Sequence, residues 1–370
     1  MQRAFRRQML IAIAACAAAV FCIAEARTPE SHGKLSVKLD KRFTVALPAV
    51  GVTWSPDSKT LGVSSNSGMT MSTFDRLGHR LTTYTQNGSE SYSPHLVGFL
   101  NGVSQTLAPL ENNPPQDAAV DIRDVATGQK VKTITRTPDN DYYPNTTGVV
   151  AVSPDQTRLA TGGSGRFFVI YHSTDGKNWT GLQARRTEKV YIVTSLCFFP
   201  DGKLIAVGMN DGQFSVVDSI TGKALKEFKA YDEPGIDDDI GGIAVNPQGT
   251  LLLTGLNSIA MQPPIVTREA LAWEKNRPAV IVWRVSDGEK IAELPDKGEN
   301  LRDAVWDPKD RFVAFADSDG LVLWQPQVAG KPFVRFPMSE LALGLAISPD
   351  GESLAVTGEN DVTVYTILNN

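Results

Sequence analysis

Short apolar runs separated by turn residues make up most of this chain. Seven times an apolar run leads into a turn of the type Ser-Pro-Asp-Gly, and a second apolar run usually follows. The turn markers are the prolines of these turns, or Asn101 in the most altered copy, and they stand at positions 56, 101, 154, 200, 247, 308 and 349. Successive markers are therefore 41 to 61 residues apart. A period of this size with Gly-rich turns is typical of repeat architectures.

The repeated turn is suited to joining two antiparallel strands. Pro presets φ for a tight turn, Asp or Asn can bond its own downstream backbone, and Gly accepts a positive φ. The copies read Trp54-Ser-Pro-Asp57, Phe99-Leu-Asn-Gly102, Val152-Ser-Pro-Asp155, Phe199-Pro-Asp-Gly202, Val245-Asn-Pro-Gln-Gly249, Trp306-Asp-Pro-Lys309 and Ile347-Ser-Pro-Asp-Gly351.

The pattern predicts three more strands after the first strand of each unit. The second strand is clear in Leu204–Gly208 and Phe312–Ala316, and a third strand follows a Gly, Asn or Asp break, as in Gln213–Asp218 and Leu321–Trp324. A fourth strand often opens with Gly-Lys or Gly-Gln, as at Gly222. Four short strands per unit, repeated radially, predict the blades of a β-propeller.

At this point the chain resembles the WD-repeat family of β-propellers, over almost everything after about residue 33. The turn motif is well kept, but the Gly-His pair that precedes each blade in that family is missing. The closing Trp-Asp appears only as Phe74-Asp75, Val217-Asp218, Trp283-Arg284, Trp324-Gln325 and Tyr365-Thr366. The resemblance implies an all-β fold: a divergent seven-bladed β-propeller of four-stranded antiparallel blades.

Ring closure predicts a role for the segment about 33–47. After the seventh turn only two strands fit, so the last blade lacks an outer strand. Gly33–Leu39 reads like the other outer strands, and Phe43–Leu47 follows it. We expect this N-terminal strand to complete blade seven, because closure removes exposed sheet edges. A disordered leader is the alternative. One propeller domain over residues 27–370 follows from this interpretation.

Residues 1–26 have the features of a signal peptide. Three arginines precede an Ala-rich apolar stretch, and Ala24-Glu25-Ala26 offers the small residues that signal peptidase requires. We expect cleavage after Ala26 and export to the periplasm or the extracellular space. Twin-arginine export through Arg6-Arg7 and lipid anchoring at Cys16 are the alternatives. No later run has the roughly 18 apolar residues of a membrane span.

Charge and cysteine content restrict the partners. The full chain has a net charge of −5, with 36 basic and 41 acidic residues, and basic residues are not clustered as a phosphate-binding surface requires. We therefore expect no nucleic-acid partner, and we expect a monomer. Cys197 is the single cysteine after the signal peptide, so disulfides are not expected, and we interpret it as a small buried apolar side chain.

The connections between strands differ greatly in length, and binding residues in propellers lie in such loops. In a WD-like propeller the long connections share one face, which we call the long-loop face. The candidates for partner binding there are Tyr142, Tyr143, Asp238, Met261, Ile265 and Trp273. The loop from Asn257 to Pro278 is the longest of these connections, and it is unusually apolar for an exposed segment. Its three interpretations are a cap on the central channel, a docking site for a partner and a satellite core packed on blade five.

Acidic residues in two of these connections are candidates for a metal site. Carboxylates at alternate positions can ligate a hard cation such as calcium, and the weak candidates are Asp139, Asp141, Asp237 and Asp239. Neither loop has EF-hand spacing, and an acidic run is more often a solvated loop. No resident cofactor is expected on this evidence.

The sequence gives little support for catalysis. The four histidines are scattered, and no nucleophile-elbow spacing occurs. The favoured function is a non-enzymatic exported scaffold that binds a protein or peptide partner through its long-loop face. The alternative is a periplasmic propeller enzyme, similar to lactonase or dehydrogenase propellers, with a metal or small substrate in the central channel.

Overall fold

The structure is a computed structural model, and it describes residues 30–31, 36–45, 49–65, 70–85, 98–100, 102, 105–109, 118–135, 149–165, 168–184, 191–230, 239–257, 280–294, 301, 303–317, 320–326, 333–338, 342–359 and 361–368. The chain divides into two units, Met1–Glu30 and Ser31–Asn370, with the two-residue strand β1 (Glu30–Ser31) at their boundary. The predicted signal peptide lies outside the described residues. Every regular element among the described residues is a β-strand.

The described strands form seven sheets, and each contains four longer strands that pair antiparallel along the sheet. The first three sheets have the orders β3-β4-β5-β6, β7-β8-β9-β10 and β11-β12-β14-β15. Their strands are β3 (Ala49–Trp54), β4 (Thr60–Ser65), β5 (Thr70–Asp75), β6 (Arg80–Thr85), β7 (Gly98–Leu100), β8 (Gln105–Pro109), β9 (Ala118–Asp124), β10 (Lys130–Thr135), β11 (Val149–Val152), β12 (Arg158–Gly162), β14 (Phe168–His172) and β15 (Thr180–Ala184).

The next sheets have the orders β16-β17-β18-β19, with the two-residue β13 (Ser164–Gly165) beside β16, then β20-β21-β22-β23 and β24-β25-β26-β27. Their strands are β16 (Tyr191–Phe198), β17 (Leu204–Met209), β18 (Gln213–Asp218), β19 (Ala224–Lys229), β20 (Asp239–Val245), β21 (Leu251–Asn257), β22 (Val280–Arg284), β23 (Lys290–Leu294), β24 (Asp303–Trp306), β25 (Val313–Asp317), β26 (Gly320–Trp324) and β27 (Phe333–Phe336).

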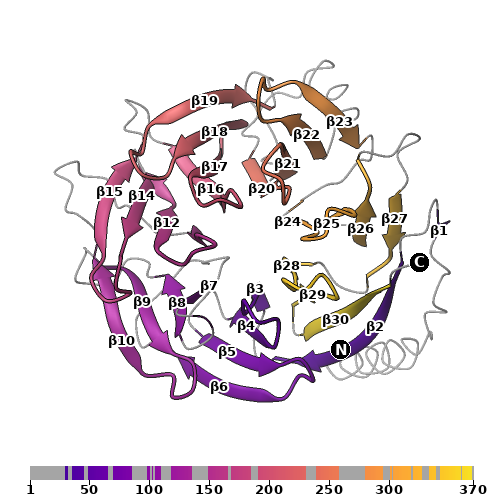
Figure 1. Ribbon diagram of the computed structural model, residues 1–370. Helices are drawn as coiled ribbons and strands as arrows, with labels where there is room; N and C mark the ends of the chain where they lie inside the picture. The colour runs from indigo at the N-terminus through magenta and orange to yellow at the C-terminus, as the bar shows by residue number, and fades with distance from the viewer. Residues whose placement is uncertain are drawn as a thin grey trace, which may run out of the picture. The chain divides into compact units, whose positions relative to one another are not determined.

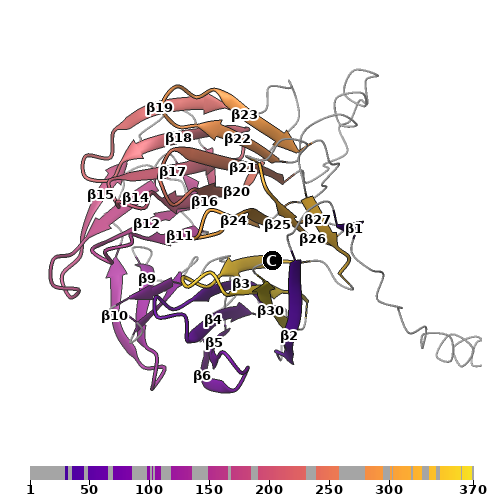
Figure 2. The ribbon, with the colours of Figure 1, turned by 45° about the vertical axis from the view of Figure 1, so that its right-hand side comes forward.

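The last sheet combines the two ends of the Ser31–Asn370 unit. Its order is β28-β29-β30-β2, with β28 (Gly344–Ile347), β29 (Ser353–Thr357), β30 (Asp361–Leu368) and β2 (Ser36–Thr44). β2 lies beside β30 (Figure 2). The two strands pair antiparallel, with a bulge between Leu39 and Lys41. The sequence predicts two segments here, Gly33–Leu39 and Phe43–Leu47. The structure instead has one strand that runs through Asp40, because the bulge absorbs the irregularity.

The sheets are arranged radially. The first strand of each sheet, which we call its innermost strand, lies nearest the centre of Figure 1, and the fourth strand lies at the rim. Each innermost strand lies beside the next, in the order β3, β7, β11, β16, β20, β24 and β28, and β28 lies beside β3. The predicted all-β propeller of four-stranded antiparallel blades is confirmed.

The repeated turns lie where the sequence predicts them, between the first and second strand of each sheet. Each places one residue at a positive φ of 58° to 69°, namely Ser58, Gly102, Gln156, Gly202, Gly249, Asp310 and Gly351. Four of these residues are glycines, for which this conformation costs little. The other three carry side chains, so at those turns the neighbouring hydrogen bonds must offset the strain.

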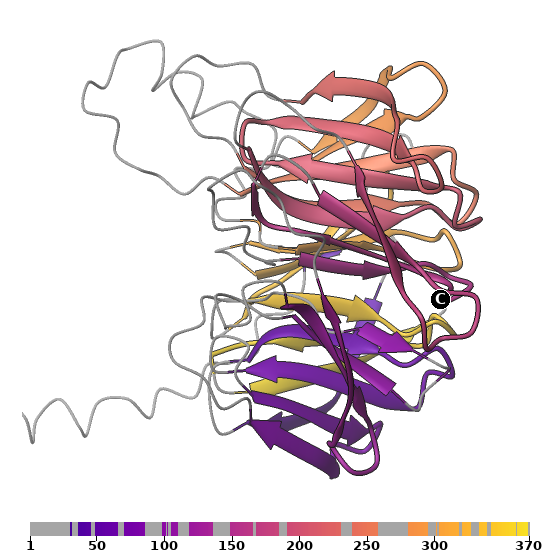
Figure 3. The same ribbon diagram turned by 90° about the vertical axis from the view of Figure 1, so that its left-hand side faces the viewer.

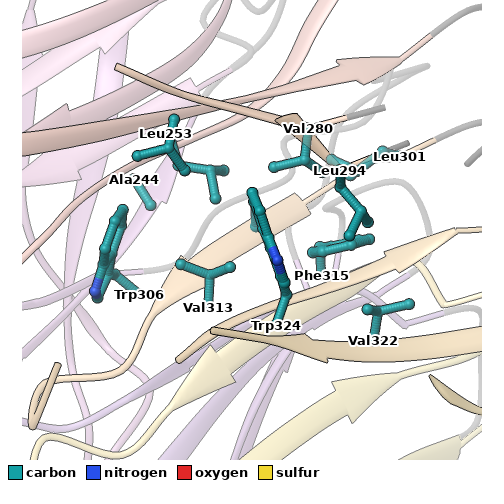
Figure 4. Close-up of a cluster of buried hydrophobic side chains, with 12 residues drawn as sticks. Ala244, Leu253, Val280, Leu294, Leu301, Trp306, Val313, Phe315, Val322 and Trp324 are labelled. Carbon is teal, nitrogen blue, oxygen red and sulfur yellow. The ribbon is translucent and has the colours of Figure 1, made fainter. Parts of the chain in front are cut away.

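Apolar side chains pack between neighbouring sheets. Six clusters occur among the described residues, and each joins two adjacent sheets. Figure 4 shows the one in which Trp306 and Trp324 meet Leu253 and Val280 of the preceding sheet. Because both faces of a blade are covered, inner strands such as β26 are buried at every residue, whereas β19 at the rim alternates between half-buried and exposed side chains. Inner strands are therefore continuous apolar runs in the sequence, whereas outer strands alternate apolar and polar residues.

Candidate functional site

Antiparallel pairing gives the propeller two different ends. The turns from first to second strand and from third to fourth strand share one end, which we call the turn end (Figure 3). The connections from second to third strand and from one sheet to the next join the opposite strand ends, which we call the connection end. The long-loop face predicted from the sequence corresponds to the connection end.

Side chains at the turn end mostly close the turns themselves. Ser55 Oγ donates to Asp57 Oδ1 at 2.7 Å and accepts Thr60 N–H at 2.9 Å. The same pattern recurs at Ser153 with Asp155, at 2.5 Å. The hydroxyls and carboxylates of these repeated turns are therefore hydrogen-bonded within the turns themselves, as the sequence predicts for a structural motif.

Aspartates close the turns between third and fourth strands. Asp218 Oδ1 accepts the Thr221 N–H at 2.7 Å and the Ile220 N–H at 3.0 Å, and Asp124 accepts the Thr127 N–H at 2.8 Å. Hydrogen bonds from Thr221 lower the pKa of Asp218, and those from Thr127 lower the pKa of Asp124, because N–H and O–H donors favour the ionised form. These aspartates act as turn caps.

Two arginines link neighbouring sheets at the turn end. Arg311 donates from Nε and Nη2 to the two oxygens of Asp307, at 2.7 and 2.9 Å, and from Nη2 to Gly351 O of the next turn at 2.6 Å. The Asp307 side chain is 0% exposed. Arg76 donates to Asp350 Oδ2 at 2.8 Å and to Ser353 Oγ at 2.6 Å. Both arginines therefore serve the packing of blade on blade.

Lysines at the rim make a third set of contacts between sheets. Lys41 Nζ of β2 donates to Leu77 O at 3.2 Å, and Lys226 Nζ of β19 donates to Val285 O at 2.5 Å. Lys132 of β10 also donates to Lys177 O. In each case the carbonyl belongs to a turn between third and fourth strands of the adjacent sheet. These three lysines thus already have partners within the fold.

Innermost strands are joined by bonds from side chains to backbone. Thr194 Oγ1 and Ser195 Oγ of β16 both donate to Ile240 O of β20, at 2.8 Å each. Trp54 Nε1 of β3 donates to Ala346 O of β28 at 3.1 Å. The Asp303 side chain of β24 is instead a hydrogen-bond acceptor: its Oδ2 accepts the Leu345 N–H of β28 at 2.9 Å.

Two titratable groups on innermost strands have raised pKa values. Burial raises the pKa of Asp303 to about 7, although the N–H groups of Leu345 and Ala304 oppose that shift. The Asp303 residue is half-buried. Burial likewise raises the pKa of the Cys197 thiol to about 11, and the charge of Asp303 adds to that effect. Cys197 is half-buried rather than buried as the sequence predicts; it packs against a core cluster and is a thiol at neutral pH.

Most residues predicted to form a site lie outside the described part of the chain. These are Asp139, Asp141, Tyr142, Tyr143, Asp237, Asp238, Met261, Ile265 and Trp273. Asp239 is described: it is the first residue of β20, it is half-buried, and it pairs with Asn257. Over the described ranges no group of three or more His, Cys, Asp or Glu side chains could hold a metal ion. The metal and partner-binding residues stay predictions.

Two structural residues were missed by the sequence reasoning. Asp303 stands directly before the apolar run Ala304-Val-Trp306 at the start of an innermost strand, and an acidic residue at that point is a visible signal. Arg311 follows Asp307 at a spacing of four, which a turn can close into an ion pair. For the described part of the chain, the structure contains no helix long and apolar enough to cross a membrane.

Comparison with known proteins adds a partial family relationship. The family described as the anaphase-promoting complex subunit 4 WD40 domain matches residues 169–246. The chain is similar to Protein HIR1 of Yarrowia lipolytica, with 26% identity over 271 residues, and the match covers 60% of this chain and 24% of the relative. For Protein HIR1 of Candida albicans the identity is 26% over 205 residues, covering 48% and 20%. For Protein HIR1 of Kluyveromyces lactis it is 23% over 241 residues, covering 58% and 27%.

The chain spans about a quarter of the length of these curated relatives. Together with the four-stranded blades, the matches support a WD-repeat-like protein.

Proposed function

We propose that the protein is an exported, non-enzymatic, seven-bladed propeller scaffold, closed by β2, that binds a protein or peptide through its connection end. The observation that carries the proposal is the difference between the two ends of the blades. At the turn end, the Ser, Asp, Arg and Lys side chains described above are bonded within the fold. A surface whose polar groups already have partners has few left to offer to a ligand.

Length and composition support the connection end. The chain inserts residues 86–97 between β6 and β7, residues 136–148 between β10 and β11, and residues 258–279 between β21 and β22. The last of these inserts contains Met261, Ile265 and Trp273. Aromatic and Met side chains are enriched at protein interfaces. WD40 propellers typically bind proteins, so the WD40 match favours the same class of partner.

Site-specific photocrosslinking tests the binding proposal. A photoreactive amino acid is placed at Ile265 or Trp273, and in a matched control at Lys203, which is exposed at the turn end. We expect crosslinks to one partner from the first two positions and none from Lys203. The purified partner should then bind the wild type, and binding should be lost when residues 258–279 are replaced by a short Gly-Ser linker. Equal crosslinking from Lys203 would refute the assignment of the binding face.

Export is tested separately by the mass of the protein recovered from cell fractions. Cleavage after Ala26 predicts a mature chain that begins at Arg27 and is absent from the cytoplasm. A chain that retains Met1 would contradict export through a cleaved signal.

One observation favours the alternative, a propeller enzyme with a metal or small substrate in its channel. Perturbed pKa values cluster at functional sites, and Asp303 on an innermost strand has one. A calcium titration of the purified protein would decide this. A stoichiometric ion and a melting temperature that falls with chelator would favour the enzyme, and the absence of both would favour the scaffold.

A further inference from the structure

Two adjacent positions of the third strand decide what lies between neighbouring sheets. The later one faces the preceding sheet, and in six sheets it is aromatic or aliphatic: Phe74, Tyr171, Val217, Trp283, Trp324 and Tyr365. The earlier one faces the following sheet, and in six sheets it is aliphatic: Ile122, Ile170, Val216, Val282, Leu323 and Val364. Each apolar pair of this kind meets in one of the six clusters between sheets. At the junction of the β3–β6 sheet with the β7–β10 sheet, which we call the polar seam, the same two positions hold Thr73 and Arg123.

Small and hydroxyl-bearing residues form the β3–β6 side of the polar seam. Thr73 is 0% exposed, and its Oγ1 lies 2.7 Å from Thr82 Oγ1 of the neighbouring strand. Gly62 pairs with Thr73, and Ser64, two residues further along β4, lies on the same face. Ser64 is 4% exposed, and its hydroxyl has no hydrogen-bond partner among the described residues.

A buried ion pair forms the β7–β10 side. Asp121 and Arg123 lie on either side of Ile122 in β9; because Ile122 packs against the following sheet, these two side chains face the β3–β6 sheet. Arg123 Nη2 donates to Asp121 Oδ2 at 3.3 Å, and the side chains are 15% and 4% exposed. Thr133 Oγ1 donates to Asp121 Oδ1 at 2.5 Å, and Arg123 Nη1 donates to Gly128 O at 3.2 Å.

These polar contacts resist separation of the two sheets only weakly. The bonds of Thr73, Asp121 and Arg123 given above each lie within one sheet, so they survive if the sheets part. Separation would expose hydroxyls and charges, which water solvates, whereas at an apolar junction it costs roughly 25 cal/mol for each Å² exposed. A buried ion pair also contributes little net stability, because desolvation offsets the attraction.

The junction between the β28–β30 sheet and the β3–β6 sheet is better fastened, although it involves the sheet that combines the two ends of the Ser31–Asn370 unit. Trp54 Nε1 donates to Ala346 O at 3.1 Å, and Arg76 donates to Asp350 Oδ2 at 2.8 Å. Both bonds cross from sheet to sheet, and an apolar cluster lies between the same two sheets.

We propose that the propeller opens at the polar seam: the β3–β6 and β7–β10 sheets part there while each sheet keeps its own hydrogen bonds. The ring then opens between two sheets that are consecutive in the chain, and the sheet that combines the chain ends stays closed. Local opening of a protein follows the regions with few buried apolar contacts, and the seam is such a region among the described residues. The opening is a property of the free protein and does not depend on the proposed partner.

Thiol labelling tests the proposal on the full chain, with the native cysteines Cys16, Cys22 and Cys197 replaced by alanine. Ser64→Cys places a buried probe in the seam, at a hydroxyl without a described hydrogen bond. Ala355→Cys is the matched control, because Ala355 is 0% exposed and belongs to the apolar cluster between the β28–β30 and β3–β6 sheets. We expect a thiol reagent to label Ser64→Cys at least about tenfold faster than Ala355→Cys, since one additional buried apolar side chain changes an opening equilibrium by about that factor or more.

Urea distinguishes opening of the seam from unfolding of the whole chain. The labelling rate of Ser64→Cys should rise with urea less steeply than global unfolding does, because opening of one junction exposes less surface. Labelling of Ser64→Cys that is no faster than that of Ala355→Cys would overturn the proposal, and so would a urea dependence as steep as that of global unfolding. If Ser64→Cys does not fold, Thr73→Cys is compared with Val216→Cys, its equivalent in the β16–β19 sheet, and the same two results decide.

Discussion

Removal of the Arg311 side chain should destabilise the propeller strongly. The guanidinium forms two hydrogen bonds to Asp307 and a third to Gly351 O, so it joins the turn of one sheet to the turn of the next. Asp307 is 0% exposed and the Arg311 side chain is 23% exposed. In Arg311→Met, the Asp307 carboxyl would stay buried and, among the described residues, would keep only the backbone N–H of Arg311 at 3.0 Å.

The expected cost follows from burial. Breaking a buried ion pair by removing one partner costs about 3–5 kcal/mol, and partial exposure of Arg311 places the expectation at about 3 kcal/mol. Arg284→Met is the matched control, because Arg284 pairs with Asp287 and Glu289 at side-chain exposures of 42%, 52% and 62%. An exposed network of that kind contributes about 1 kcal/mol or less.

Urea unfolding, followed by intrinsic tryptophan fluorescence, measures both variants. A double variant sharpens the experiment: Asp307→Ser with Arg311→Met removes the buried charge and installs the residue that opens the turns at Ser55, Ser153 and Ser348. It should regain most of the stability that Arg311→Met loses. The reasoning is refuted if Arg311→Met costs no more than Arg284→Met, or if the double variant is less stable than the single one.

Three further predictions concern other parts of the fold. Trp283→Phe should cost more than Trp324→Phe in urea unfolding, because Trp283 Nε1 donates to Thr254 Oγ1 at 2.9 Å whereas Trp324 Nε1 has no partner among the described residues. Gly288→Ala should lower the melting temperature more than Gly102→Ala, although both residues have a positive φ. A Cβ at Gly288 would lie 2.1 Å from the ring of Phe228, whereas no atom of a described residue lies within 4 Å of a Cβ at Gly102. The aspartates that close the turns have lowered pKa values. Their stabilising contribution is therefore present above pH 3.8 and is lost as the pH falls through their folded-state pKa values. Circular dichroism should show acid unfolding below about pH 4.

The turns and inner strands could be predicted from sequence because both signals are local. A turn such as Ser153-Pro-Asp155 contains its own hydrogen-bond partners, and a strand covered on both faces, such as β17, is apolar at almost every position. Outer strands are less well determined. β2 is half polar, and its bulge after Leu39 depends on its register with β30, which lies at the other end of the chain.

Contacts between sheets could not be read from the sequence for the same reason. Arg311 reaches Gly351 only because neighbouring turns lie side by side, and the Asp303 link requires Leu345 of the following sheet. Strand register also decides whether a buried tryptophan N–H has a hydrogen-bond acceptor. Thr254 lies two residues beyond the strand partner of Trp283, whereas Phe315, which cannot accept the bond, occupies the equivalent position beside Trp324. The partner-binding residues proposed from sequence lie on long connections whose composition suggests contact but whose geometry depends on the rest of the fold.

The carboxylates of this propeller show that hydrogen bonds alone do not set the direction of a pKa shift. Asp218 and Asp303 each accept two backbone N–H groups at 2.7–3.0 Å, yet the pKa of Asp218 is lowered and that of Asp303 is raised. The turn aspartate is in contact with water, so the N–H groups and the Thr221 hydroxyl add to its hydration. For Asp303, burial raises the pKa by more than its two N–H groups lower it. Stabilisation by Asp303 is therefore greatest when it is protonated and is lost as the pH rises toward 7, whereas the turn aspartates stabilise the fold when ionised. The two effects have opposite signs in separate pH ranges, so Asp303→Asn should change the neutral side of the stability profile and leave its acid side unaltered.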